Sequence, residues 1–139
     1  LLLDLATGKA RLEGLCMPHS PRLHRGQVWL HNSGQGWLGR ADLEAGRFEP
    51  VAFVPGILRG LAFHGEHAVA ATSQTRYFGR QELPIEVELA RRGTAGECGV
   101  CVINVATGQV EHRLVFQGLQ ELYDVQVLPG AAHPRLVTG

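Results

Sequence analysis

Short apolar runs alternate with polar residues along this chain, and glycine-containing turns separate the runs. Three segments share one pattern, in which an apolar run is followed by Asp or Asn, a short gap, Gly and a second run. These segments are 1–14, 38–56 and 100–118. Alternation with a period of two is typical of β-strands, so the pattern predicts that each segment is a hairpin.

The turns of these three segments have the same chemistry. Each begins with a side chain that can accept hydrogen bonds from the next backbone amides, and each ends with glycine, which adopts positive φ at little cost. The residues are Asp4, Asp42 and Asn104 at the first position and Gly8, Gly46 and Gly108 at the second. The spacing therefore predicts three equivalent turns.

A second kind of hairpin lies between the first ones, in 19–34, 58–73 and 122–139. Two alternating hairpins make a unit of four antiparallel strands, which is the sequence signature of β-propeller blades. We therefore predict an all-β chain in which 1–139 forms a single propeller-type domain or half of a propeller. Its parts are an outer half-blade (1–14), a blade (15–56), a second blade (57–118) and an inner half-blade (119–139).

The second predicted blade is longer than the first. The first turn type recurs after 38 positions, from Asp4 to Asp42, and then after 62, from Asp42 to Asn104. The excess falls in 74–97, where Pro84 suits a helix start and Gly93 suits a helix end. We expect a short helical insertion near 82–92, between the second and third strands of this blade.

The two predicted half-blades are complementary, because 1–14 has the outer two strands of a blade and 119–139 has the inner two. Paired within one chain they would make three blades, fewer than the usual four to eight or so. Two further arrangements stay open. A homodimer would complete a six-bladed ring by exchanging half-blades, or the remainder of a longer chain would complete it.

Composition and charge narrow the classes of partner. Lys plus Arg and Asp plus Glu number 13 each, which does not favour nucleic acid binding. No apolar run approaches the roughly 20 residues that cross a bilayer, so we expect a soluble protein with no membrane contact. The three cysteines, Cys16, Cys98 and Cys101, cannot all pair within one chain, which favours a reducing compartment, the cytoplasm.

Polar side chains cluster at the predicted inner strands, which line the channel of a propeller. We therefore expect residues of three successive units to converge at the channel mouth, where they are candidates for binding a ligand. The candidates are His19, Ser20, Arg22, Asn32, Arg59, Glu121, Tyr123 and Asp124. The alternative is structural: Arg59, Glu121 and Asp124 would form buried ion pairs that hold neighbouring blades together.

The sequence words "MPHSPR" (17–22), "GRFEPVAFVPG" (46–56) and "ELYDV" (121–125) resemble an uncharacterised bacterial family of conserved hypothetical proteins. In some members of that family the domain occurs next to tetratricopeptide repeats, and members are typically longer than this chain. The resemblance implies a β-propeller-like domain. It brings no established reaction, so it assigns no catalytic residue.

Two functional classes follow from these observations. We favour a binding or assembly module without a cofactor, which takes a peptide or a small molecule at the channel mouth. The alternative is a propeller enzyme. It would be a metal-assisted hydrolase with Asn32, Glu121 and Asp124 as ligands of calcium or magnesium, or a lyase or hydrolase with His19 and Asp124 as acid and base. The fold alone supports neither class, because propellers host unrelated functions.

Overall fold

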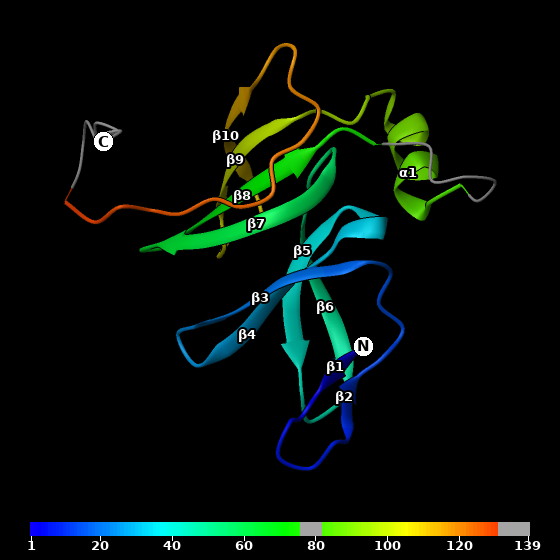
Figure 1. The fold of residues 1–139 in the computed structure, drawn as a ribbon, viewed down its shortest axis with the longest axis vertical. Coiled ribbons are helices and arrows are strands. Elements are labelled where there is room, and N and C mark those ends of the chain that lie inside the picture. The colour runs from blue at the N-terminus through cyan, green and yellow to red at the C-terminus, as the bar shows by residue number, and fades with distance from the viewer. Residues whose placement is uncertain (76–81, 131–139) are drawn as a thin grey trace, which may run out of the picture.

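The computed structural model describes residues 1–75 and 82–130 and consists mostly of β-strands with one α-helix (Figure 1). The strands form three antiparallel sheets of two, four and four strands. The elements are β1 (Leu2–Leu3), β2 (Ala10–Leu12), β3 (Pro18–His24), β4 (Gln27–Asn32), the 3-10 helix η1 (Ser33–Gln35), β5 (Trp37–Asp42), β6 (Arg47–Phe53), β7 (Ile57–His64), β8 (His67–Ser73), α1 (Pro84–Arg92), β9 (Gly99–Asn104) and β10 (Val110–Val115).

Each four-stranded sheet is a simple meander. The first sheet has the order β3-β4-β5-β6 and the second β7-β8-β9-β10 with strands in sequence order, while β1 and β2 form a separate hairpin. The predicted mostly-β fold with four-stranded antiparallel units is thus confirmed at the level of the sheets. A closed ring of blades is not present in the part of the chain that the structure describes.

The three equivalent turns are confirmed. In the first, the Asp4 carboxylate accepts hydrogen bonds from the amides of Ala6 and Thr7 at 3.0 and 3.1 Å. Asp42 and Asn104 accept the corresponding pairs of bonds in their own turns. The glycines that follow, Gly8, Gly46 and Gly108, have φ of 68°, 64° and 72°.

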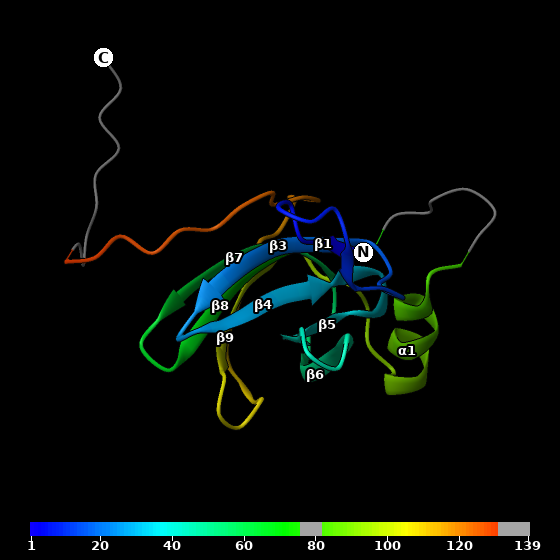
Figure 2. The same ribbon diagram turned by 90° about the horizontal axis from the view of Figure 1, so that it is seen from below.

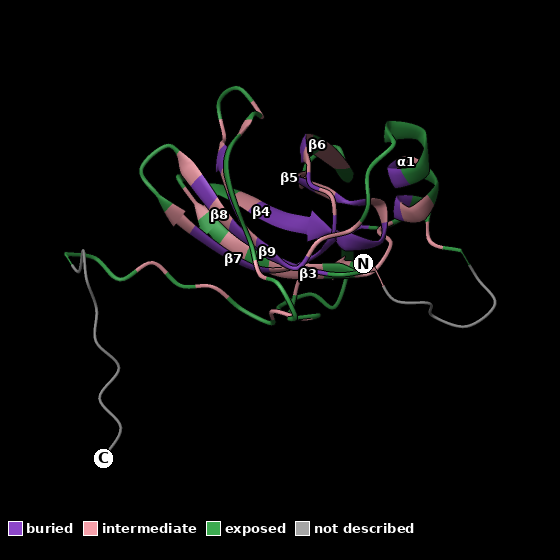
Figure 3. Cartoon of the chain, turned by 90° about the horizontal axis from the view of Figure 1, so that it is seen from above, coloured by how far each residue is buried: buried purple, intermediate pink, exposed green. Residues whose placement is uncertain are grey.

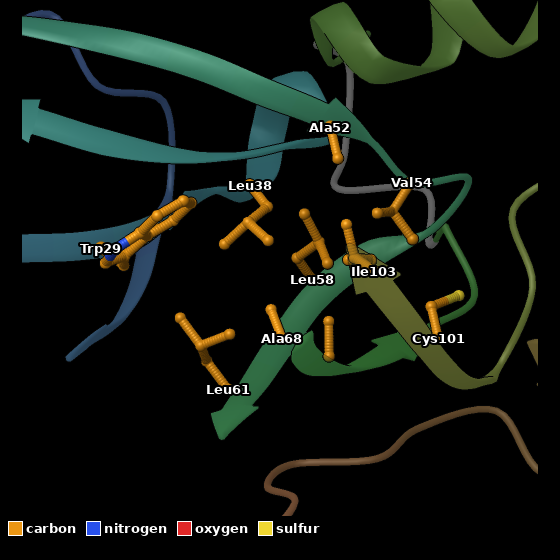
Figure 4. Packing of buried hydrophobic residues seen from close by; sticks show 10 residues of the cluster. Trp29, Leu38, Ala52, Val54, Leu58, Leu61, Ala68, Cys101 and Ile103 are labelled. Atoms are coloured by element: carbon orange, nitrogen blue, oxygen red, sulfur yellow. The ribbon is translucent and has the colours of Figure 1, made fainter. Parts of the chain in front are cut away.

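The main core lies between the two four-stranded sheets. Trp29 and Leu38 of the first sheet pack against Leu58, Leu61 and Ile103 of the second (Figure 4). Figure 3 shows buried residues on β4, β7 and β8, whereas the hairpin loops and 119–130 are mainly exposed. The hydrophobic effect therefore holds the sheets together face to face.

Helix α1 occupies the predicted insertion between β8 and β9. Ile85 and Leu89 face inward and pack with Ile57, which gives the helix a small core of its own. The helix begins at Pro84 and is followed by Gly93 at a φ of 63°, as the sequence predicts.

Residues 119–130 run along β7 and form no strand (Figures 1 and 2). The backbone passes directly against Gly60, where an added Cβ would lie 2.4 Å from the Val125 nitrogen and 2.5 Å from the Asp124 Cα. The rest of the predicted inner half-blade, 131–139, lies outside the described residues.

We predict that Leu38→Ala lowers the free energy of unfolding by about 2–5 kcal/mol, because it leaves a cavity between the sheets. The matched control is Leu23→Ala on β3, where the side chain is 75% exposed, and it should stay within about 0.5 kcal/mol of wild type. Urea denaturation measures both. Equal effects of the two substitutions would contradict the placement of the core.

Candidate functional site

Strands β3 and β7, the first strands of the two four-stranded sheets, meet through side chains that donate hydrogen bonds to backbone carbonyls. Pairing is irregular between His19 and Arg22 in β3, and between Leu58 and Leu61 in β7. The first sheet and η1 supply donors to the carbonyls of the irregular part of β7. The bonds are Ser33 Oγ to Leu58 O (2.6 Å), Ser20 Oγ and His31 Nδ1 to Arg59 O (2.5 and 3.1 Å), and Arg22 Nε to Leu61 O (3.0 Å). We call this set of bonds the seam.

One seam contact recurs at the next unit. Ser33 donates to the Leu58 carbonyl 25 residues later, and Ser73 donates to the Leu122 carbonyl 49 residues later. The two sequence separations differ by 24 residues, which is the length of the segment 74–97 that contains the insertion. Segment 119–127 therefore lies against the second sheet as β7 lies against the first.

Arg59 is the centre of a polar group that we call the Arg59 cluster: His19, Arg59, Glu121 and Tyr123. Arg59 Nη1 donates to His19 Nε2 at 2.8 Å, and Nη2 lies 3.9 Å from Glu121 Oε1. The guanidinium carbon is 5.9 Å from the centre of the Tyr123 ring. The Tyr123 hydroxyl donates to Glu121 Oε2 at 2.6 Å, so the carboxylate contacts both the arginine and the tyrosine.

Arg22 and Asp124 form a second pair beside this cluster, with 3.6 Å between Nη2 and Oδ1. The Asp124 side chain is 54% exposed, so the expectation of a buried ion pair is wrong for this residue. It is wrong because, within the described residues, 119–130 forms no strand and pairs with no sheet, which leaves the Asp124 side chain exposed. For Arg59 and Glu121 the expectation holds better, since both side chains are mostly buried.

The two histidines of the site are held as hydrogen-bonding groups. Nε2 of His19 accepts a hydrogen bond from Arg59. The ring hydrogen is therefore on Nδ1, which faces the Met17 carbonyl and the Ser33 hydroxyl. Burial lowers the pKa of His19, and the charge of Arg59 adds to this effect. Burial lowers the pKa of His31 to about 3, so its ring is neutral near pH 7.

Of the candidates outside the Arg59 cluster, Ser20 bonds the Arg59 carbonyl and Arg22 pairs with Asp124 beside the cluster, whereas Asn32 has other partners. Its Oδ1 accepts from the Cys16 amide at 2.7 Å and its Nδ2 donates to Gln35 at 2.9 Å, so it fixes the loop before β3. Sequence reasoning missed His31 and Ser33 of the seam, and also Ser73, which contacts Leu122. The available signal was a serine that directly follows β4 in the first unit and ends β8 in the second.

The residues of the enzymatic alternative have other hydrogen-bonding and charged partners. The Asn32 amide is engaged away from Glu121, and Asp124 pairs with Arg22 rather than with His19. Among residues 1–75 and 82–130, no three His, Cys, Asp or Glu side chains are grouped to hold a metal ion. The arrangement instead presents donors, acceptors and an aromatic ring.

Fold and site together define a mostly β protein whose sheets meet through a polar seam beside a mixed-charge cluster. The chain belongs to the family described as Domain of unknown function (DUF4915), which matches residues 1–137. This match confirms the expected membership of an uncharacterised conserved family. No curated protein matches the chain. Within the described residues, no helix has the length and apolar character needed to span a membrane.

We predict that Ser73→Ala loosens 119–127, because the hydroxyl both donates to the Leu122 carbonyl and accepts from the Leu122 amide. Losing such bonds costs about 1–3 kcal/mol locally, so the Leu122 amide should exchange with solvent at least about fivefold faster. Hydrogen exchange followed by NMR measures this. Thr94→Ala, which removes an exposed hydroxyl after α1, is the control. Unchanged exchange at Leu122 would contradict the assigned contact.

We predict that His31 makes the fold less stable in acid. Its pKa is near 6.5 in the unfolded chain and about 3 in the fold, so the unfolded state binds the extra proton between these values. The free energy of unfolding should fall by up to about 1.4 kcal/mol per pH unit as pH decreases through this window. Urea titrations from pH 7 to pH 4 on wild type and His31→Gln measure this contribution as the difference in slope. Identical slopes would show that His31 takes up a proton without unfolding.

Proposed function

We propose that this chain contributes blades to a β-propeller and acts as a binding or assembly module, with its ligand at the Arg59 cluster. Two meander sheets with adjacent inner strands support this proposal. So does the repeated serine contact, which gives 119–127 the position of a third inner strand. In such a ring the Arg59 cluster lies on the inner segments, near one mouth of the channel.

The observation that carries the proposal is the position of Tyr123. Tyr123 is 73% exposed as a residue, yet its hydroxyl donates a hydrogen bond to Glu121 and its ring lies near Arg59. Tyrosine and arginine are enriched at binding interfaces and among the residues that dominate binding energy. A ring that is already oriented loses less conformational freedom when a ligand binds.

The charges around Tyr123 indicate the chemistry of the ligand. Arg22 and Arg59 supply positive charge, and Glu121 and Asp124 supply negative charge within the same surface. A peptide segment offers both signs together with backbone donors and acceptors, and therefore suits this surface better than a polyanion does. We place the module in the cytoplasm, which is consistent with three cysteines that are all unpaired.

We predict that short peptides bind at Tyr123. A pooled library of random tripeptides, titrated into the ¹⁵N-labelled chain, should shift the amide signals of His19, Arg59 and Tyr123. Tyr123→Ala should weaken binding of the best peptide at least about tenfold, which corresponds to about 1.4 kcal/mol. Leu23→Ala, on the same inner strand as His19 but outside the cluster, is the control and should bind like wild type.

Two results would overturn this proposal. One is the absence of any peptide-dependent shift at the cluster. The other is equal affinity in wild type and Tyr123→Ala, because the exposed ring would then make no contribution.

A further inference from the structure

Arg59 is a mostly buried cation with more hydrogen-bond donors than acceptors around it. A guanidinium carries five N–H groups and no acceptor. Within the described residues, Nη1 donates to His19, Nη2 lies 3.9 Å from a Glu121 oxygen, which is too long for a hydrogen bond, and Nε has no partner. Bonds to a carboxylate are among the strongest that arginine makes. This guanidinium therefore retains donors for an acceptor that comes from outside the chain.

The acceptor that Arg59 does contact is the ring of a neutral histidine. Arginine does not lose its proton in proteins, so Nε2 of His19 accepts the bond and Nδ1 carries the ring hydrogen. Nδ1 lies 2.9 Å from the Met17 carbonyl and 3.0 Å from the Ser33 hydroxyl, which fix the ring in this orientation. A protonated ring would turn an N–H toward the guanidinium. The contact between His19 and Arg59 therefore exists only while His19 is neutral.

The backbone beside His19 has an unusual conformation. Three non-glycine residues in the described parts of the chain have positive φ, and two of them, Met17 at 48° and Ser20 at 49°, lie close to His19 in sequence. The third, Arg25, belongs to the turn between β3 and β4. Non-glycine residues rarely adopt positive φ, and such residues concentrate at functional sites. The chain thus accepts strain in the segment that holds His19 against Arg59.

The surroundings of His19 disfavour a second ring proton. Burial lowers the pKa of His19, and the charge of Arg59 lowers it further. The other titratable, charged or polar groups around it belong to the elements packed against β3 or to β3 itself: His31 of β4, Ser33 of η1, Arg22 of β3, and Glu121 and Asp124 of segment 119–127. His31 is neutral, and the two carboxylates contact Arg59 and Arg22. A ligand that brings a carboxylate would reverse the balance, because an opposite charge favours the protonated ring.

We propose that Arg59 and His19 together bind a carboxylate of the ligand, and that His19 takes up a proton as the carboxylate enters. The bond between Arg59 Nη1 and His19 Nε2 breaks, solvent supplies the proton to Nε2, and both nitrogens then donate to carboxylate oxygens. This inference rests on the proposed function, because it assigns one chemical group of the ligand at the Arg59 cluster. The C-terminus of a peptide and a small carboxylic acid in its ionised form both have this chemistry.

The first experiment uses acetate, which is the carboxylate alone. Sodium acetate is titrated into the ¹⁵N-labelled chain at constant ionic strength, and NMR follows the His19 ring. We expect acetate to raise the pKa of His19 by at least about one unit. By linkage, acetate affinity should rise as pH falls from 8 to 6, by up to about tenfold per pH unit. Acetamide has a similar shape without the charge, and it should leave the pKa unchanged.

The variant that isolates the proton is His19→Gln. Its amide oxygen can still accept from Arg59, but the side chain takes up no proton, so acetate affinity should not change between pH 8 and pH 6. His64→Gln, at the exposed end of β7, is the matched control and should keep the pH dependence of wild type. Circular dichroism reports whether the variants are folded. If His19→Gln is unfolded, the wild-type titration of the His19 ring with and without acetate decides.

Two results would overturn the inference: a His19 pKa that acetate does not change, and the same pH dependence of acetate affinity in wild type and in folded His19→Gln. Peptides identify the source of the carboxylate. If it is the C-terminus, amidation of the best tripeptide should weaken binding at least about tenfold. Equal affinity together with the acetate effect assigns the site to a small carboxylic acid. Peptide binding at Tyr123 without the acetate effect leaves the proposed function standing and overturns this inference alone.

Discussion

The seam between β3 and β7 depends on carbonyls that the second sheet leaves without ladder partners. β7 is the edge strand of its sheet and pairs irregularly between Leu58 and Leu61, and the carbonyls of Leu58 and Arg59 accept hydrogen bonds from Ser33, Ser20 and His31. A buried carbonyl without a partner costs free energy comparable to a lost hydrogen bond. Apolar residues at these donor positions would leave carbonyls unpaired, so the inner edge is polar although the rest of the contact is apolar.

The same bonds fix the backbone position of Arg59, the central residue of the Arg59 cluster. Ser20 and His31 both hold the Arg59 carbonyl, which fixes the backbone from which the guanidinium extends. The side chain then reaches His19 on the neighbouring strand and approaches Glu121 on the following segment. In the function we propose, a site on a backbone that is already fixed would lose little conformational freedom when a ligand binds.

Much of the fold was predictable because it depends on interactions between residues that are close in sequence. The Asp4 and Asn104 turns and the Pro84 helix start depend on neighbours within a few residues, and the sequence pattern alone predicted them. The convergence of His19, Arg59 and Glu121 was also predictable, because a repeat gives equivalent positions equivalent places. The hydrogen-bonding role of His31 was not predictable, because its partner lies 28 residues away and depends on an irregularity in β7. The exposure of Asp124 depends on what covers 119–130, which no local pattern encodes.

Ser20, Arg59 and Tyr123 occupy the same position in three successive units. The serine contacts align Leu58 with Leu122, and hence Arg59 with Tyr123; the irregularities of β3 and β7 align Ser20 with Arg59. Along this position each side chain contacts the next unit: Ser20 holds the Arg59 carbonyl, and Arg59 lies against the Tyr123 ring. Each unit of a repeat protein contacts mainly its neighbours, so these contacts hold the units together. Ser33 and Ser73 are both serine and make the same contact in the two units, whereas the residues at the other position, Ser20, Arg59 and Tyr123, differ in type. The residue type therefore varies at the position whose side chains carry hydroxyl, guanidinium and aromatic groups, and the serine contact between the units stays the same.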